Sequence, residues 1–164
     1  MRFTSRRGLV ASAILAGFLM TSWAQQVDPN DRKSYADKVR PTYNFLFGPE
    51  NISAPGNLRV TGNDFVPPQA FLPASYCGRC HQEAYSQWRQ ALHSNSFRTP
   101  FYRTSVNILL RTKGIEFTRH CDSCHNPIGV LSGALTKDSE VDRSFDEDGL
   151  TCTTCMSARA IARR

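Results

Sequence analysis

The first feature of the hydrophobic pattern is a short apolar stretch, which runs from Leu9 to Met20. Three arginines precede it, and the small-x-small sequence Ser22-Trp23-Ala24 follows it. This layout is typical of a secretory signal peptide, and the stretch is shorter than the roughly 20 residues of a membrane-spanning helix. The sequence therefore predicts a signal peptide over residues 1–24, with an uncleaved N-terminal anchor as the alternative. No second apolar stretch of this length follows, so we expect no membrane span after cleavage.

Residues 25–72 show little periodicity, and they contain six of the nine prolines. Short aromatic groups, such as Tyr43 and Phe45, lie between the prolines. Because proline interrupts helices and sheet ladders alike, this segment is predicted to be an extended arm that lies across the following domain. A mobile linker is the alternative.

Helical periodicity appears in the domain predicted over residues 73–155. The stretch His81–His93 contains no Gly or Pro, and four of its residues fall at positions i, i+4, i+7 and i+11 of one helix face. These residues are His81, Tyr85, Trp88 and Leu92. We therefore predict a helix whose residues Tyr85, Trp88 and Leu92 belong to the core.

A further helix is predicted to begin at Thr99-Pro100, an N-cap followed by proline at the first helical position, and to end at Gly114. Asn126-Pro127 predicts a turn, and the acidic stretch Asp138–Asp148 predicts an exposed loop. Together these patterns predict a mainly α fold with much irregular structure.

The formal charge of +6 does not describe the predicted domain and arm. Three of the twenty Lys and Arg residues lie in residues 1–24 and three in the tail 156–164, and neither segment contains an acidic residue. Residues 25–155 contain 14 basic and 14 acidic residues. A basic surface for nucleic acid is therefore not expected.

The six cysteines form three Cys-x-x-Cys pairs. The pairs are Cys77/Cys80, Cys121/Cys124 and Cys152/Cys155. Exported chains with even numbers of cysteines commonly form disulfides. However, histidine follows the first two pairs directly, and Cys-x-x-Cys-His is the attachment motif of c-type haem. The spacing therefore favours two covalent haems.

This spacing has a mechanical reason. Two thiols three positions apart can bond to the two vinyl groups at one porphyrin edge, and the next residue then presents an imidazole to the iron. His81 and His125 are the predicted proximal ligands. A zinc site on the two pairs and redox-active dithiols or disulfides are the alternatives, but the pairs lie about 40 residues apart, against the roughly 15–20 of a zinc ribbon.

The third pair, Cys152/Cys155, is followed by Met156 instead of histidine. We therefore expect no stable third haem, and we expect the two cysteines to form a disulfide or to remain free. The Ala- and Arg-rich residues 156–164 resemble an aberrant end of a longer, C-terminally truncated chain.

The chain from Pro73 to Cys155 resembles the multihaem c-type cytochrome family, which includes small tetrahaem electron carriers and larger oxidoreductases. The motifs that carry the resemblance are Cys77-x-x-Cys80-His81, Trp88-x-x-x-x-His93, His120-Cys121-x-x-Cys124-His125-Asn126-Pro127 and Cys152-x-x-Cys155. The resemblance implies an architecture wrapped around covalent haems, with His93 and His120 as candidate distal iron ligands.

Geometry restricts how the distal histidines can act. His93 lies 12 residues after His81, which a continuous helix would place about 18 Å away, and His120 adjoins Cys121 on the proximal side of its own haem. We therefore expect each to bind an iron attached elsewhere in the chain.

Iron held by two histidines favours electron transfer over catalysis, because no axial position remains for a substrate. The sequence thus predicts a carrier that is periplasmic or otherwise exported, with two haem c groups and redox proteins as partners. The alternatives are a truncated fragment of a multihaem oxidoreductase, which would need an open axial position, and a zinc or thiol-redox protein.

Overall fold

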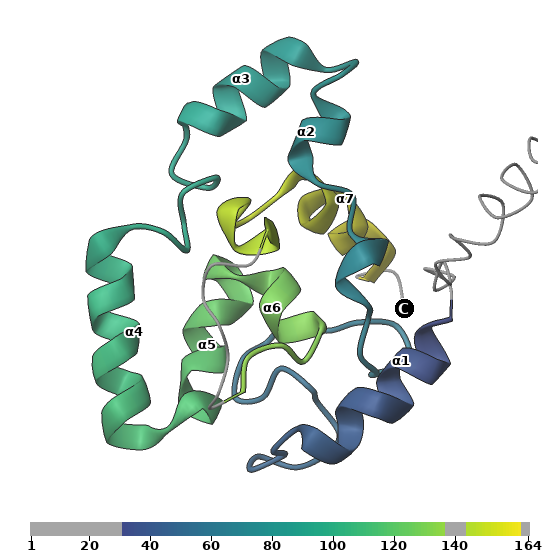
Figure 1. The fold of residues 1–164 in the computed structure, drawn as a ribbon, viewed down its shortest axis with the longest axis vertical. Helices are drawn as coiled ribbons and strands as arrows, with labels where there is room; N and C mark the ends of the chain where they lie inside the picture. Colours follow the sequence, from purple (N-terminus) through teal and green to yellow (C-terminus); the bar gives the residue numbers. More distant parts are fainter. Residues whose placement is uncertain (1–30, 137–143, 162–164) are drawn as a thin grey trace, which may run out of the picture.

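The computed structural model describes residues 31–136 and 144–161. This part of the chain consists of helices joined by turns and irregular segments, with no strand (Figure 1). The predicted mainly α fold with much irregular structure is confirmed. No helix within the described ranges is both long enough and apolar enough to cross a membrane. The predicted signal peptide over residues 1–24 lies outside them.

Within the segment predicted as an extended arm, residues 31–72 contain short helices. These are α1 (Arg32–Val39), η1 (Arg40–Thr42) and η2 (Pro68–Ala70), joined by turns. The Asp31 side chain accepts a hydrogen bond from the amide of Ser34 at 3.0 Å, and this N-cap begins α1. The helix ends before the next proline, Pro41. The helix was not predicted because apolar residues show only weak helical periodicity in this stretch.

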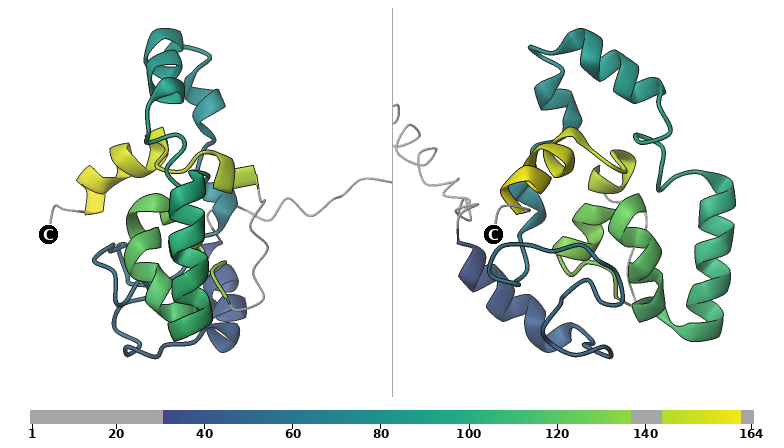
Figure 2. Two further views of the ribbon diagram at one scale, coloured as in Figure 1. Left: turned by 90° about the vertical axis from the view of Figure 1, so that its left-hand side faces the viewer. Right: turned by 180° about the vertical axis from the view of Figure 1, so that it is seen from behind.

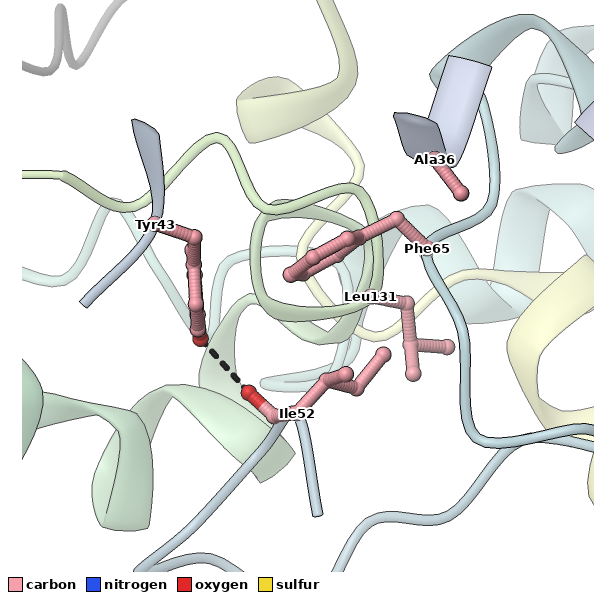
Figure 3. Packing of buried hydrophobic residues seen from close by; sticks show 5 residues of the cluster. All are labelled: Ala36, Tyr43, Ile52, Phe65 and Leu131. Atoms are coloured by element: carbon pink, nitrogen blue, oxygen red, sulfur yellow. Dashed lines mark hydrogen bonds between the residues drawn. The ribbon is translucent and has the colours of Figure 1, made fainter. Parts of the chain in front are cut away.

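The same segment supplies four of the five residues of the buried hydrophobic cluster. The core cluster consists of Ala36, Tyr43, Ile52, Phe65 and Leu131 (Figure 3). Only the last of these comes from the later part of the chain, at the end of α6 (Pro127–Leu131). The amide of Val66 donates to the Leu131 carbonyl at 3.0 Å, and the Tyr35 hydroxyl donates to the Ser132 carbonyl at 2.7 Å. Residues 31–72 therefore pack against the domain that carries the second Cys-x-x-Cys-His motif.

Arg119 ties this segment to α5 (Ile115–His125). Its side chain is only 2% exposed, its guanidinium carbon lies 3.7 Å from the Tyr43 ring centroid, and it donates to the Asn44 carbonyl at 2.7 Å. Burial lowers the pKa of Arg119. A buried guanidinium held over an aromatic ring contributes up to about 2 kcal/mol to stability. The face of α5 that carries Arg119 therefore packs against the N-terminal segment.

The helix predicted over His81–His93 is shorter than expected. It is α3 (Gln82–Gln90), and the backbone becomes extended at Ala91. Ser94 Oγ donates to the Ala91 carbonyl at 3.0 Å, as serine side chains do where they compete with helical hydrogen bonding. Leu92 therefore lies beyond the helix and is 83% exposed, so its predicted place in the core is wrong.

The helix predicted after Thr99 is confirmed as α4 (Pro100–Lys113), with Thr99 at the N-cap and Gly114 at the C-cap. Gly114 alone separates α4 from α5, and its φ of 100° lies in the region that glycine adopts most readily. The two helices pack together as a hairpin (Figures 1 and 2).

The Asn126-Pro127 step ends α5 and begins α6. The Asn126 side chain accepts from the Gly129 amide at 3.0 Å and donates to Asp146 Oδ1 at 2.6 Å. Asp146 lies in η3 (Ser144–Glu147) and is 2% exposed. The exposed loop predicted over Asp138–Asp148 is therefore wrong at this residue, while residues 138–143 lie outside the described part.

Candidate functional site

The second Cys-x-x-Cys-His motif occupies the last turns of α5. Its side chains border a cavity of about 410 Å³ between α4 and α5. The cavity is lined by Tyr102, Ser105, Val106, Leu109, His120, Cys121, Cys124 and His125. α5 thus presents Cys121, Cys124 and His125 on one side, whereas Arg119 packs against the N-terminal segment.

Two contacts fix the His125 ring. Its Nδ1 lies 2.7 Å from the Ser96 carbonyl oxygen, and because a carbonyl only accepts, Nδ1 is the protonated nitrogen. Tyr102 stacks on the ring at 3.8 Å between centroids and 5° between planes. Nε2 is therefore the ring nitrogen that remains to act as an iron ligand.

Tyr102 is itself held by a buried carboxylate. Its hydroxyl donates to Asp122 Oδ1 at 2.5 Å, and the Asp122 side chain is 1% exposed. Burial raises the pKa of Asp122, while its hydrogen bonds from Tyr102 and Thr118 act in the opposite direction. Burial, and next the Asp122 charge, raise the pKa of the Tyr102 hydroxyl. The hydroxyl thus remains a donor, which keeps the ring stacked on His125.

Ser96 joins this histidine to the segment that leads to the third cysteine pair. Its Oγ donates to the His125 carbonyl at 3.0 Å and accepts from the Leu150 amide at 3.0 Å. The Leu150 amide also donates to the His93 carbonyl at 3.0 Å. One serine therefore positions the end of α5, the turn after α3 and the approach to α7 (Cys152–Ile161).

We expect Ser96→Ala to destabilise the haem-loaded protein by about 1–2 kcal/mol, because two partly buried hydrogen bonds are lost at about 1 kcal/mol each. The backbone carbonyl that holds His125 Nδ1 remains, so haem content should not change. Urea unfolding followed by circular dichroism measures the first effect, and intact mass measures the second. Ser86→Ala, at an exposed position of α3, is the control. Equal unfolding midpoints for both variants would contradict the role of Ser96.

The first motif lies at the junction of α2 (Ala74–Cys77) and α3. Cys77 ends α2, His81 is the N-cap of α3, and the His81 amide donates to the Cys77 carbonyl at 2.9 Å. A Cβ on Gly78 would come within 2.8 Å of the Tyr85 ring. The Cys-x-x-Cys turn therefore packs closely on α3, while Cys80 and His81 remain exposed.

The third cysteine pair lies beside the first motif. Trp88 Nε1 donates to the Leu150 carbonyl at 2.9 Å, and α7 packs against α2. Burial raises the pKa of the Cys152 thiol, and the neighbouring Cys77 thiol adds to this increase. Met156, in α7, is 74% exposed.

The predicted distal ligands occupy different places. His120 is exposed on α5 and lines the same cavity as His125, whereas His93 is exposed in the turn between α3 and α4. Within residues 31–136 and 144–161, no three His, Cys, Asp or Glu side chains gather closely enough to hold a metal ion. The predicted ligands therefore do not converge on one small site.

Ser96 and Tyr102 were not among the predicted site residues. Tyr102 shares helical spacing with Val106 and Leu109, and this pattern could have indicated a cavity-facing side of α4. Ser96 had no such signal, because its main contact with His125 uses the backbone carbonyl.

The residues at the second motif fit a covalently attached haem. The Cys121 and Cys124 thiols are free, the His125 ring uses Nδ1 and not Nε2 for its contact with Ser96, and Val106 and Leu109 give the cavity an apolar wall. Thioether bonds and one axial imidazole need this donor set.

The sequence model of the family described as cytochrome c554 and c-prime matches residues 76–157. No curated protein and no solved structure matches the chain. The family match covers all three cysteine pairs and half of the chain. On this match, together with the haem-fitting geometry at His125, the chain belongs to the cytochrome c554 and c-prime family of c-type cytochromes.

Proposed function

We propose that this protein is an exported c-type cytochrome that carries two covalent haems and transfers electrons to and from redox partner proteins. One haem is held by Cys77, Cys80 and His81, and the other is held by Cys121, Cys124 and His125. The observation that carries the proposal is the fixed His125 ring, whose Nδ1 donates to the Ser96 carbonyl at the edge of a cavity lined by two free thiols. When bound, each haem iron supplies one-electron redox chemistry.

The protein's own residues orient and shield these groups. Ser96 and Tyr102 fix the His125 ring, and a hydrogen-bonded imidazole is a more basic iron ligand. Val106 and Leu109 line the cavity and would shield one side of the second haem from water, and burial of this kind influences reduction potential. His93 and His120 are the proposed distal ligands of irons attached elsewhere in the chain. Both are exposed and so remain available to a haem.

The proposed domain organisation keeps the boundaries that the sequence predicts. A signal peptide over residues 1–24 directs the chain to the periplasm or otherwise out of the cytoplasm, and residues 31–72 pack on the haem domain proposed for residues 73–155. Because Met156 replaces the proximal histidine, the pair Cys152/Cys155 holds no stable haem.

The test is expression with a haem-attachment system, followed by intact mass and absorption spectroscopy. We expect the mass of the cleaved chain plus two haems, and a low-spin spectrum in the reduced state. High-spin iron would indicate an open axial position and would favour an oxidoreductase fragment. A mass equal to that of the bare polypeptide, with no Soret band, would contradict the proposal and favour a zinc or thiol-redox protein.

A further inference from the structure

The third cysteine pair has no role in the proposed haem sites, and its first member lies against the first haem motif. Cys77 ends α2 and Cys152 begins α7, and these two helices pack together. The Cys77 thiol is close enough to the Cys152 thiol to contribute to its raised pKa. Both side chains are partly buried, whereas Cys80 and Cys155 are exposed. The structure thus brings together two thiols that are 75 positions apart in the sequence.

Two hydrogen bonds join the chain segments that carry the two thiols. The Thr153 hydroxyl donates to the Leu72 carbonyl at 2.7 Å, next to Cys152. The Ala74 amide, at the start of α2, donates to Asp148 Oδ2 at 2.8 Å. These bonds hold the start of α7 beside α2, so the backbone segments that carry Cys77 and Cys152 lie close together.

We propose that Cys77 and Cys152 form a disulfide in chains whose first motif has not received haem, and that this disulfide competes with haem attachment there. Each thiol gives up one proton and one electron, one S–S bond forms, and a disulfide-bearing oxidant is reduced to two thiols. The competition rests on the proposed haem at Cys77 and Cys80, whereas the disulfide itself does not. With Cys77 oxidised, Cys80 alone cannot bond to both vinyl groups.

This pairing has an advantage over a disulfide within Cys152-x-x-Cys155. A bond between residues far apart in the sequence removes more conformational freedom from the unfolded chain than a bond across two residues. The long-range bond also joins two helices that already touch, so its formation needs little movement of the backbone.

The disulfide is tested on the full chain exported from cells that lack a haem-attachment system. The chain is treated with oxidised glutathione, alkylated with iodoacetamide and digested without reduction, and cross-linked peptides are identified by mass spectrometry. We expect a peptide pair joined through Cys77 and Cys152. That pair should be lost in Cys152→Ser and retained in the matched control Cys155→Ser. Disulfides confined to neighbouring cysteines of each pair, or full alkylation of Cys77 and Cys152, would overturn the proposal.

The competition is tested in cells that contain the attachment system. We expect Cys152→Ser to raise the share of chains with haem on Cys77 and Cys80 toward the share with haem on Cys121 and Cys124, and Cys155→Ser to leave it unchanged. Equal shares in the parent chain and Cys152→Ser would overturn the competition. Absence of haem from both motifs would instead refute the proposed function, and the peptide map would still decide whether the disulfide forms.

Discussion

Replacement of His125 by alanine should remove one haem from each chain and leave the other in place. The imidazole of His125 is held by Ser96 and Tyr102 at the edge of the cavity. As the proposed axial ligand, it would hold the iron while the Cys121 and Cys124 thiols bond to the vinyl groups. Without it, the porphyrin has no anchor on that side. Intact mass and the absorbance of the pyridine haemochrome per chain measure the loss.

His120→Ala is the matched comparison, because His120 lies on the same helix and lines the same cavity. As a proposed distal ligand, it should change the spin state of one iron without removing any covalent haem. Peptide mapping would locate the remaining haem in both variants. Unchanged haem content in His125→Ala would contradict the role of His125 as a proximal ligand. Loss of a whole haem in His120→Ala would contradict the role of His120 as a distal ligand.

Local sequence signals predicted the part of this site that lies within short segments. The Cys-x-x-Cys-His spacing, the N-cap at Thr99 and the glycine at 114 depend on neighbours within a few residues. The structure accordingly places α4 at its predicted limits, and the two motifs occupy helix ends. Such features need no knowledge of the rest of the chain.

The remaining features depend on contacts between distant segments. The carbonyl of Ser96 contacts His125, which lies 29 positions later in the sequence, and Cys77 lies close to Cys152, 75 positions later. Neither contact leaves a periodic pattern. Asp146 was predicted to be exposed on account of its acidic neighbours, yet the buried Asn126 amide pairs with it. Polar residues that satisfy one another inside a fold cannot be distinguished by composition from solvated ones.

The N-terminal segment shows the same limit most clearly. Its prolines favoured an arm, but Tyr43, Ile52 and Phe65 meet Leu131 only after the chain has turned back on itself. Phe65 is fully buried, its ring centroid lies 4.7 Å from that of Tyr43 in an edge-to-face arrangement, and a Cβ on Gly133 would come within 2.9 Å of it. Close packing of this kind determines stability.

Phe65→Ala should therefore destabilise the protein by about 3–5 kcal/mol, the range for removal of a buried phenylalanine. This is a large fraction of the roughly 5–15 kcal/mol that stabilises a typical domain. Urea unfolding of the haem-loaded protein, followed by far-ultraviolet circular dichroism, measures the change. The control is Phe101→Ala, because Phe101 is 85% exposed on α4 and its removal should change stability by no more than about 0.5 kcal/mol. A similar loss in the two variants would contradict the core assignment.

The haem absorbance in the same titration tests whether the N-terminal segment supports the site. The Val66 amide bonds to the Leu131 carbonyl at the end of α6, and α6 begins at Pro127, two positions after His125. Loss of the Phe65 ring should therefore lower the urea midpoint of the Soret change together with that of the circular dichroism change. If the segment were a separate unit, only the circular dichroism would shift and the Soret midpoint would stay at its parental value. Coincident transitions would show that residues far from both motifs help to hold the second haem in place.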